Sequence, residues 1–259
     1  MRKWIYFGKK RKNYNMKKIL YLISLSTLLF ACTDDKSISK EMHGHWMQKD
    51  FYEAIVSKKN IAEITAPMME FIIPANDSNA TIITYGKKSV TAELVPYKKN
   101  HVVIKNYFGN NINADVKLVE NELHFINGYT QEKIAYVKIT DEVYKPSNYN
   151  ENLSKSIPFV HHQYISGTYS LDSIEVKFVD EGKVKGLDKF ENFSLCYEPS
   201  CRNGKNNTLF LSDINYEGNY YEYEIKGDSL LIYDIDTYAI ARGMKSGKLG
   251  VKYALKKIN

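Results

Sequence analysis

Glycine and proline are scarce in this chain. Its 259 residues include 14 Gly and 6 Pro, which excludes a collagen-like or low-complexity protein. Apolar residues make up 44% and charged residues 25%, an ordinary balance that argues against wholesale disorder. The length fits one or two globular domains.

An excess of positive charge is absent from most of the chain, although the formal net charge is +6. Residues 1–31 hold eight of the 36 Lys and Arg residues and none of the 30 Asp and Glu residues. The remainder therefore has 28 basic against 30 acidic residues, a net charge of −2. Once the N-terminus is removed, little positive field remains to bind a phosphate backbone. We expect no nucleic-acid partner.

Motifs for phosphate or dinucleotide binding are also missing. Residues 227–230 read Gly-Asp-Ser-Leu, which resembles the nucleophile block of the GDSL family of esterases. That family places its catalytic histidine near the C-terminus, whereas no histidine follows His162 here, so Ser229 lacks its base. A Gly-Asp hairpin turn explains the four residues. We expect no catalytic residue and no cofactor.

The histidines do not form a recognisable metal-binding motif. His43 and His45 would share one face of a strand, as half of a metal site would, and His161 is adjacent to His162. No carboxylate or cysteine at ligand spacing completes either pair. We interpret the histidines as surface or rim residues and predict no metal site. The six are His43, His45, His101, His124, His161 and His162.

The longest apolar run is short. Residues 19–31 are uncharged and mostly apolar, and they follow Lys17 and Lys18. Thirteen residues cannot cross about 30 Å of hydrocarbon, but they fit the core of a secretory signal peptide. Met16 is an alternative start, because Met16-Lys17-Lys18 alone makes a normal beginning for such a peptide. We predict a signal peptide over residues 1–31.

The end of this run carries a lipidation signal. Residues 29–32 read Leu-Phe-Ala-Cys and resemble the lipobox of bacterial lipoproteins. The resemblance implies cleavage before Cys32, with a diacylglyceryl group on its sulfur and an acyl chain, such as palmitate, on its amine. Each buried methylene contributes about 0.8 kcal/mol, so several chains anchor a protein stably in a membrane. The alternative is a plain signal peptide with an incidental cysteine. Residues 32–42 would form the lipidated tether.

The residues after Cys32 bear on the final location. Residues 33–36 read Thr-Asp-Asp-Lys and resemble the acidic signal that exports lipoproteins to the surface of Bacteroidetes-type bacteria. The alternative is an ordinary polar tether. We expect a lipid-anchored protein of the outer membrane and favour the cell surface over the periplasm-facing side.

Cysteine is rare, with three residues in the chain. If Cys32 is lipidated, Cys196 and Cys201 remain, and an oxidising compartment favours a short-loop disulfide between them. Two free thiols are the alternative. A redox or metal site is a weaker one, because four intervening residues exceed the two-residue redox spacing and no histidine is near.

The rest of the sequence is typical of an all-β protein. Short runs of β-branched and aromatic residues alternate with turn residues, which predicts antiparallel meanders that close into barrels. Asp50 and Glu53 have capping-box spacing, and a helix over about 51–58 is expected to plug one barrel mouth. The predicted strands span residues 43–47, 69–73, 80–85, 90–97, 101–106, 114–119, 122–126, 133–140, 167–171, 174–179, 183–187, 191–197, 208–213, 219–226, 229–235, 238–242 and 248–257.

The strand pattern occurs twice. Residues 116–127 match residues 223–234 at a constant offset of 107, with apolar positions at every second residue and a hairpin turn in the same place. Each half opens alike, Gly-His-Trp at 44–46 and Gly-Thr-Tyr at 167–169, and each closes on an alternating strand, 136–139 matched with 253–256. The alternative is that any two meanders look alike.

We therefore predict two β modules of similar architecture. The first spans residues 43–144 and the second residues 165–259. The linker spans residues 145–164 and begins with a polar stretch, 145–156, that has no strand period.

Gly44-His45-Trp46 at the head of the first strand, followed by a short helix and eight strands, resembles the lipocalin-like families of bacterial lipoproteins. The resemblance implies a cup-shaped barrel in which Gly44 and Trp46 pack the closed end, or floor, and which holds a small apolar ligand. The sequence departs from the family in two ways. The first module has no Arg to pack on Trp46, and the second has Tyr169 instead of Trp.

These observations favour an envelope or surface protein that binds a small apolar ligand or a protein partner and is not an enzyme. Two other classes remain open. One is a hydrolase built on the same barrel, which would need two carboxylates or a Ser-His pair in a cleft. The other is a structural or interaction lipoprotein without a small ligand, which would show filled barrels and an exposed aromatic patch.

Overall fold

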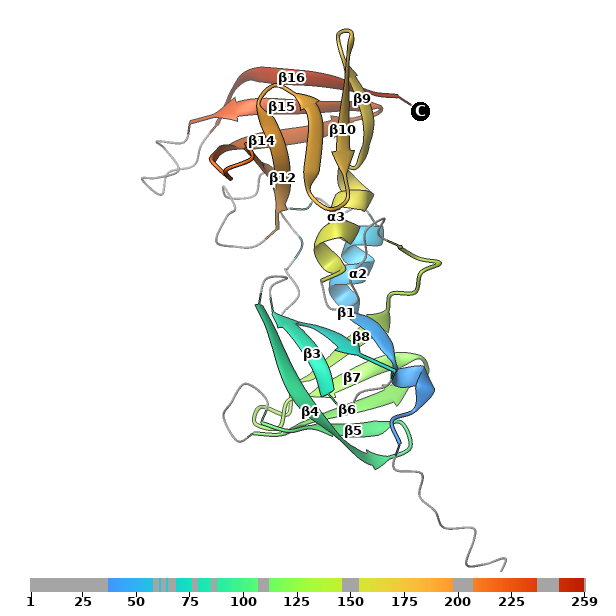
Figure 1. The fold of residues 1–259 in the computed structure, drawn as a ribbon. Helices are drawn as coiled ribbons and strands as arrows, with labels where there is room; N and C mark the ends of the chain where they lie inside the picture. The colour runs from blue at the N-terminus through green and yellow to red at the C-terminus, as the bar shows by residue number, and fades with distance from the viewer. Residues whose placement is uncertain are drawn as a thin grey trace, which may run out of the picture.

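The protein folds as two closed eight-stranded antiparallel β-barrels that follow one another along the chain (Figure 1). The predicted all-β, two-barrel fold class is thereby confirmed. The computed structural model describes residues 37–57, 61, 64, 69–75, 79–84, 88–106, 112–145, 154–197, 207–236 and 247–258.

Both barrels run up and down, with each strand paired to its neighbours in sequence. The first closes through β1 and β8, and the second through β9 and β16. The first barrel and its helices comprise η1 Lys40–Met42, β1 Gly44–Gln48, α2 Lys49–Val56, β2 Met69–Ile73, β3 Asn79–Thr84, β4 Lys88–Lys98, β5 His101–Ile104, β6 Ala114–Val119, β7 Glu122–Ile126 and β8 Lys133–Lys138. Helix α3, Ser156–Tyr164, then precedes β9 Gly167–Leu171, β10 Ile174–Val179, β11 Lys183–Leu187, β12 Phe190–Cys196, β13 Thr208–Ser212, β14 Gly218–Lys226, β15 Ser229–Ile235 and β16 Lys248–Ile258.

The predicted strands agree with the observed ones to within two residues at each end. The single predicted strand without a counterpart, 238–242, lies outside the described residues. This agreement arises because the strands alternate buried and exposed residues, as in β7, and positive-φ residues such as Asn121 mark the turns.

The two barrels are equivalent strand by strand. The repeat found at an offset of 107 superposes β6 and β7 on β14 and β15, which are the sixth and seventh strands of their barrels. The closing strands were matched two residues out of register. Leu123 pairs with Tyr136 and its counterpart Leu230 pairs with Leu255, so Tyr136 corresponds to Leu255 and not to Tyr253. A two-residue shift keeps every side chain on the same face, so alternation alone cannot fix it.

Large side chains pack inside both barrels. In the first, the ring of Phe71 lies 5.5 Å from that of Phe125 and 4.8 Å from that of Tyr136. In the second, the rings of Phe178 and Phe193 are 5.1 Å apart. All five side chains are buried. Packed interiors of this kind stabilise small barrels by removing apolar surface from water.

Helix α2 starts earlier than predicted, and it packs against the second barrel. It begins two residues earlier, directly after β1, and its N-cap residue Gln48 makes no side-chain capping bond. Asp50 therefore lies inside the first turn, where a carboxylate favours the helix dipole. Its buried face joins the core of the second barrel: the Phe51 ring lies 5.6 Å from that of Tyr197. The helix thus lies between the barrels, beside α3 (Figure 1).

Helix α3 lies within the predicted linker and was not foreseen. Its buried residues, Phe159 and Val160, pack with α2 and the second barrel in one continuous core. The Phe159 ring stacks on Tyr52 at 5.6 Å. Pro158, in the first turn where a missing backbone N–H costs no helical hydrogen bond, is the sequence signal that could have revealed it.

Candidate functional site

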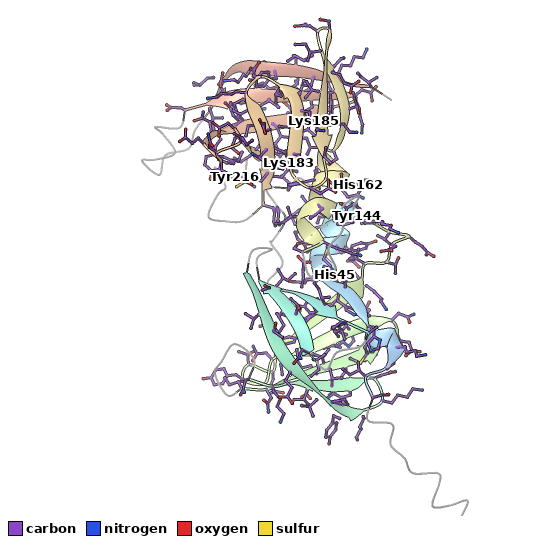
Figure 2. The ribbon with its side chains drawn as sticks, in the orientation of Figure 1. His45, Tyr144, His162, Lys183, Lys185 and Tyr216 are labelled. Atoms are coloured by element: carbon purple, nitrogen blue, oxygen red, sulfur yellow. The ribbon has the colours of Figure 1, made fainter. Side chains whose placement is uncertain are left out.

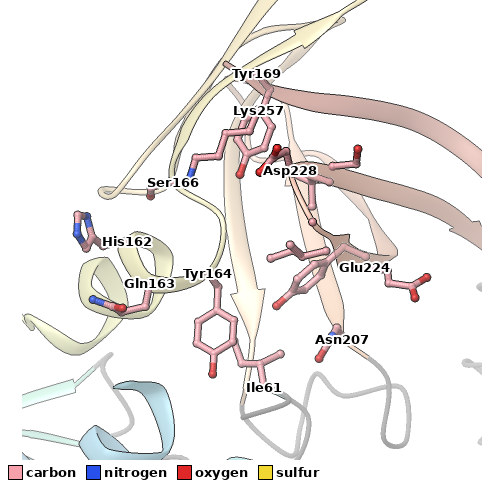
Figure 3. A pocket seen from close by; sticks show the side chains of 15 residues that line it. Ile61, His162, Gln163, Tyr164, Ser166, Tyr169, Asn207, Glu224, Asp228 and Lys257 are labelled. Atoms are coloured by element: carbon pink, nitrogen blue, oxygen red, sulfur yellow. The ribbon is translucent and has the colours of Figure 1, made fainter. Parts of the chain in front are cut away.

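A cavity of about 410 Å³ opens at the end of the second barrel, next to the C-terminal turn of α3 (Figure 3). Its walls come from α3, from the start of β9, from the turn between β14 and β15, and from the end of β16. The residues are Ile61, His162, Gln163, Tyr164, Ser166, Tyr169, Asn207, Tyr223, Glu224, Ile225, Gly227, Asp228, Ser229, Leu230 and Lys257.

The turn between β14 and β15 shapes one wall. Lys226 pairs with Ser229, which leaves Gly227 and Asp228 as a two-residue turn. Gly227 has φ +57°, a left-handed conformation that glycine adopts without strain. The Asp228 carbonyl accepts a hydrogen bond from the backbone N–H of Lys257 at 2.6 Å, which fixes the end of β16 against the turn. The Gly-Asp-Ser-Leu block is thus a hairpin turn that faces the cavity.

Charged side chains of both signs border the cavity. Lys257 and Asp228 are exposed, and neither makes an ion pair with another described residue. Glu224 differs, because its carboxylate contacts Lys248 at 3.1 Å and Lys226 at 3.2 Å. Figure 3 shows the side chains of Lys257 and Asp228 at the same end of the cavity. One cation and one anion are therefore available to a ligand.

Tyrosines supply the aromatic part of the wall. Burial raises the pKa of Tyr164 and that of Tyr169 to about 12. Burial, and then the nearby Tyr164, also raise the pKa of Tyr223. All three hydroxyls are therefore protonated at neutral pH and can donate hydrogen bonds. Tyr169 donates its proton to the carbonyl oxygen of Ile165, at 2.8 Å.

Three cavity residues carry buried polar atoms with no hydrogen-bond partner in the described part of the chain. They are the hydroxyl oxygens of Ser166 and Tyr223 and the amide oxygen of Asn207. A buried polar group left unsatisfied costs about 1–3 kcal/mol. Because all three residues line the cavity, a small rotation of their side chains would let an occupant hydrogen-bond to them.

Ser229 and His162 line the same cavity, although the sequence separates them by 67 residues. The imidazole Nδ1 of His162 lies 3.1 Å from a carboxylate oxygen of Asp180. This His–Asp pair also contacts Tyr144, whose hydroxyl donates to Asp180 at 3.1 Å (Figure 2). His162 and Ser229 come from opposite walls, α3 and the β14–β15 turn, and no hydrogen bond between these two described side chains is present.

The predicted cysteine sites are only partly within the described residues. Cys32 and Cys201 both lie outside them. Cys196 ends β12, is buried, and is disulfide-bonded. Its predicted pairing with Cys201 stays a prediction.

The predicted floor residues lie where the first barrel meets η1. Trp46 is 1% exposed, and its indole N–H donates to the carbonyl oxygen of Met42 at 2.8 Å. The role expected of an arginine is taken by Lys138, whose ammonium lies 5.5 Å from the centre of the Trp46 ring. Gly44 has φ +129°, and a Cβ there would come within 2.5 Å of Lys138. The positive φ favours glycine here, and a larger residue would also displace the end of the Lys138 side chain.

Two histidines are not surface or rim residues as predicted. His45 is 3% exposed and His161 is 1% exposed. His161 donates from Nδ1 to the carbonyl oxygen of Asp180 at 2.7 Å, and burial lowers its pKa to about 4, so it is a neutral core residue. Sequence pattern did not reveal this because α3, which carries His161, was assigned to a linker.

Two further observations concern the described residues alone. They contain no group of three or more His, Cys, Asp or Glu side chains arranged to hold a metal ion. No helix among them is long and apolar enough to cross a membrane.

The cavity residues themselves were not predicted as a site. Gly227, Asp228 and Ser229 were interpreted as a turn, which is correct, but their proximity to Lys257 depends on barrel closure. His162 and Tyr164 lie on the helix that was missed. The repeat was the one available signal, because it places the β14–β15 turn at the same barrel end as β9 and β16.

Comparison of the chain with models of protein families, with curated proteins and with solved structures found no match.

Proposed function

We propose that the protein is a lipid-anchored protein of the bacterial outer membrane that binds a small zwitterionic ligand at the end of its second barrel. The observation that carries the proposal is the pair Lys257 and Asp228, exposed charges of opposite sign on one cavity without partners among the described residues. An amino acid or short peptide presents a carboxylate and an ammonium group that match them. Closed barrels of this size commonly serve as binding scaffolds.

The cavity favours this ligand over the purely apolar one expected from the lipocalin-like resemblance. Apolar and aromatic side chains, Ile61 and Tyr164 among them, would hold an apolar side chain of the ligand. The unsatisfied atoms of Ser166, Asn207 and Tyr223 would hold its peptide groups. Sites of this volume usually combine apolar walls with a few polar groups that orient the ligand.

The charge requirement is tested by calorimetric titration of the unlipidated chain from residue 33 with the dipeptide Ala-Phe. Its N-acetylated and C-amidated derivatives each lack one charge, and each should bind with an affinity at least about tenfold lower. Lys257→Met should weaken Ala-Phe but leave the amide unchanged, because the amide has no carboxylate to lose. Lys256→Met, one residue earlier on β16, is the matched control.

Two results would contradict the proposal. One is a dissociation constant for Ala-Phe above about 10 mM. The other is equal affinity for Ala-Phe and both derivatives.

The Tyr223 hydroxyl provides an independent test. Tyr223→Phe removes an unsatisfied buried hydroxyl, so it should raise the unfolding free energy of the empty protein by about 1 kcal/mol while weakening Ala-Phe binding. Tyr253→Phe, which removes a hydroxyl bonded to Asp188 outside the cavity, should lower stability without changing affinity. A loss of stability in Tyr223→Phe would show that this hydroxyl already has a partner.

A hydrolase is the second candidate, because Ser229 and His162 share the cavity and His162 is held by Asp180. In this function Ser229 would be the nucleophile and His162 its base. Hydrolysis of p-nitrophenyl acetate that is abolished by Ser229→Ala and by His162→Gln would establish it. Hydrolysis unaffected by either substitution would exclude it.

A further inference from the structure

A second cavity of about 410 Å³ lies on the first barrel, far along the chain from the site above. It is bounded by the start of β1, the end of β2 and the segment that follows β8. Ile72, Pro74 and Ile139 give it apolar walls. A cavity with such walls can hold the apolar body of a small molecule.

Basic side chains predominate around this cavity. His43, Lys138 and Lys155 line it, and the single carboxylate among the lining residues is Asp141. Asp141 is already engaged, since it contacts Lys155 at 3.5 Å and Lys145 at 3.8 Å. Among the described residues, Lys138 is therefore the lining ammonium that no carboxylate contacts.

His45 adds an unsatisfied nitrogen to the same wall. Its Nε2 lies 2.6 Å from the carboxylate of Glu70, which also accepts hydrogen bonds from the backbone N–H of Lys155 at 3.2 Å, from the Ser154 hydroxyl at 2.6 Å and from the Ser156 hydroxyl. These donors favour the ionised carboxylate, so His45 Nε2 carries a proton. Nδ1 of His45 is buried without a partner in the described part of the chain. Figure 2 places His45 at the side of the first barrel nearest the helices.

The pKa shifts of His43 and Lys138 show that the charged forms of both side chains are disfavoured in this cavity. Burial lowers the pKa of His43, and the positive charges of Lys138 and Lys40 lower it further, against a smaller opposing effect of Glu41. Burial also lowers the pKa of Lys138, partly offset by Glu41. An anion bound among these groups would favour their charged forms.

We propose that this cavity binds an amphiphilic anion, a molecule with one carboxylate on an apolar body. The carboxylate lies among Lys138, His43 and Lys155, and the apolar body lies against Ile72, Pro74 and Ile139. The Glu70 carboxylate fixes the orientation of the His45 ring in the cavity wall. This site is independent of the zwitterion cavity of the second barrel.

The test uses octanoate and octanol, which share an apolar chain and differ in charge. In titrations of the unlipidated chain from residue 33, octanoate should bind at least tenfold more tightly than octanol. Lys138→Met keeps the apolar stem of the lysine and should reduce octanoate affinity about tenfold while leaving octanol unchanged. His43→Gln should also reduce octanoate affinity, and it leaves the contact between Lys138 and Trp46 in place.

Two control variants locate the binding. Lys133→Met changes an exposed lysine of β8, the strand that carries Lys138, that does not line the cavity, and it should leave octanoate affinity unchanged. Lys257→Met should also leave it unchanged, which separates this site from the second-barrel cavity. Equal binding of octanoate and octanol, no binding of octanoate, or octanoate binding that is insensitive to Lys138→Met and His43→Gln would overturn the proposal.

Discussion

Trp46 and Tyr169 make the same hydrogen bond in the two barrels, each to the carbonyl oxygen four residues earlier, at 2.8 Å. Trp46 bonds to Met42 after a 3₁₀ turn, and Tyr169 bonds to Ile165 after α3. Each aromatic residue also pairs across the closing strands with a lysine, Lys138 or Lys257. The two barrels therefore close with the same arrangement of an aromatic residue, a backbone carbonyl and a lysine, although the aromatic residue differs.

Buried His161 should make the protein acid-sensitive. Its pKa is about 6.5 in the unfolded chain and about 4 in the folded one, so between these values the unfolded state binds a proton that the folded state does not. Stability from this residue is complete above pH 6.5 and falls by roughly 3 kcal/mol as pH drops to 4. Denaturant titrations at pH 7 and pH 5 should show the loss, and His161→Gln should show less of it.

The adjacent His162 provides the control for this prediction. Its side chain is 51% exposed, so His162→Gln does not remove the cost of charging the buried His161, and the loss of stability between pH 7 and pH 5 should persist. Identical pH profiles for wild type and His161→Gln would show that His161 does not titrate as proposed.

Phe51→Ala should destabilise the second barrel, although Phe51 belongs to the first module. The substitution removes the contact with Tyr197 and leaves a cavity in the shared core, at a cost of about 3 kcal/mol. Hydrogen exchange should speed up across β9–β16 more than across β1–β8. Phe125→Ala, inside the first barrel, should show the reverse order, and equal effects of both variants would refute the shared core.

Cys196 and Cys201 should be unreactive before reduction. A disulfide between them predicts no alkylated thiol in the folded mature protein and two after reduction, measured by mass. The closed ring is short, so reduction should lower the unfolding free energy by only about 2 kcal/mol. Two reactive thiols without reductant would refute the pairing.

Cys32→Ser should abolish lipid anchoring. The variant should accumulate unprocessed or leave the membrane fraction, because the substitution removes the sulfur that would carry the diacylglyceryl group. Membrane fractionation and the mass of the mature chain measure this. Wild-type mass and attachment in the variant would contradict the lipoprotein prediction.

Sequence patterns predicted the strands well and the helices poorly. Strands such as β7 alternate with period two, and turn residues limit them, so both signals are local. Helix α3 buries the polar Ser156 and His161 together with Phe159 and Val160, so it lacks a clear amphipathic period. The burial of Phe159, Val160 and His161 is explained only by the packing of α3 against α2 and the second barrel.

The candidate sites could not be predicted, because they depend on contacts between distant segments. Lys257 meets Asp228 through the closing register of β16, and His45 meets Glu70 through the pairing of β1 with β2. The sequence contains each residue but not its partner. His45 in particular was assigned to the surface, because alternation identifies an outward face but not the linker that covers it.

The position of helix α2 also has a consequence for folding during synthesis. Ribosomes release the first barrel before the second, so Phe51 and Ile55 emerge long before the side chains that bury them in the finished protein. Until the segments that carry Phe159 and Tyr197 are made, α2 lacks the aromatic partners that bury it. Phe51, in the first fifth of the chain, therefore reaches its native surroundings only after Tyr197, 146 residues later, has been made.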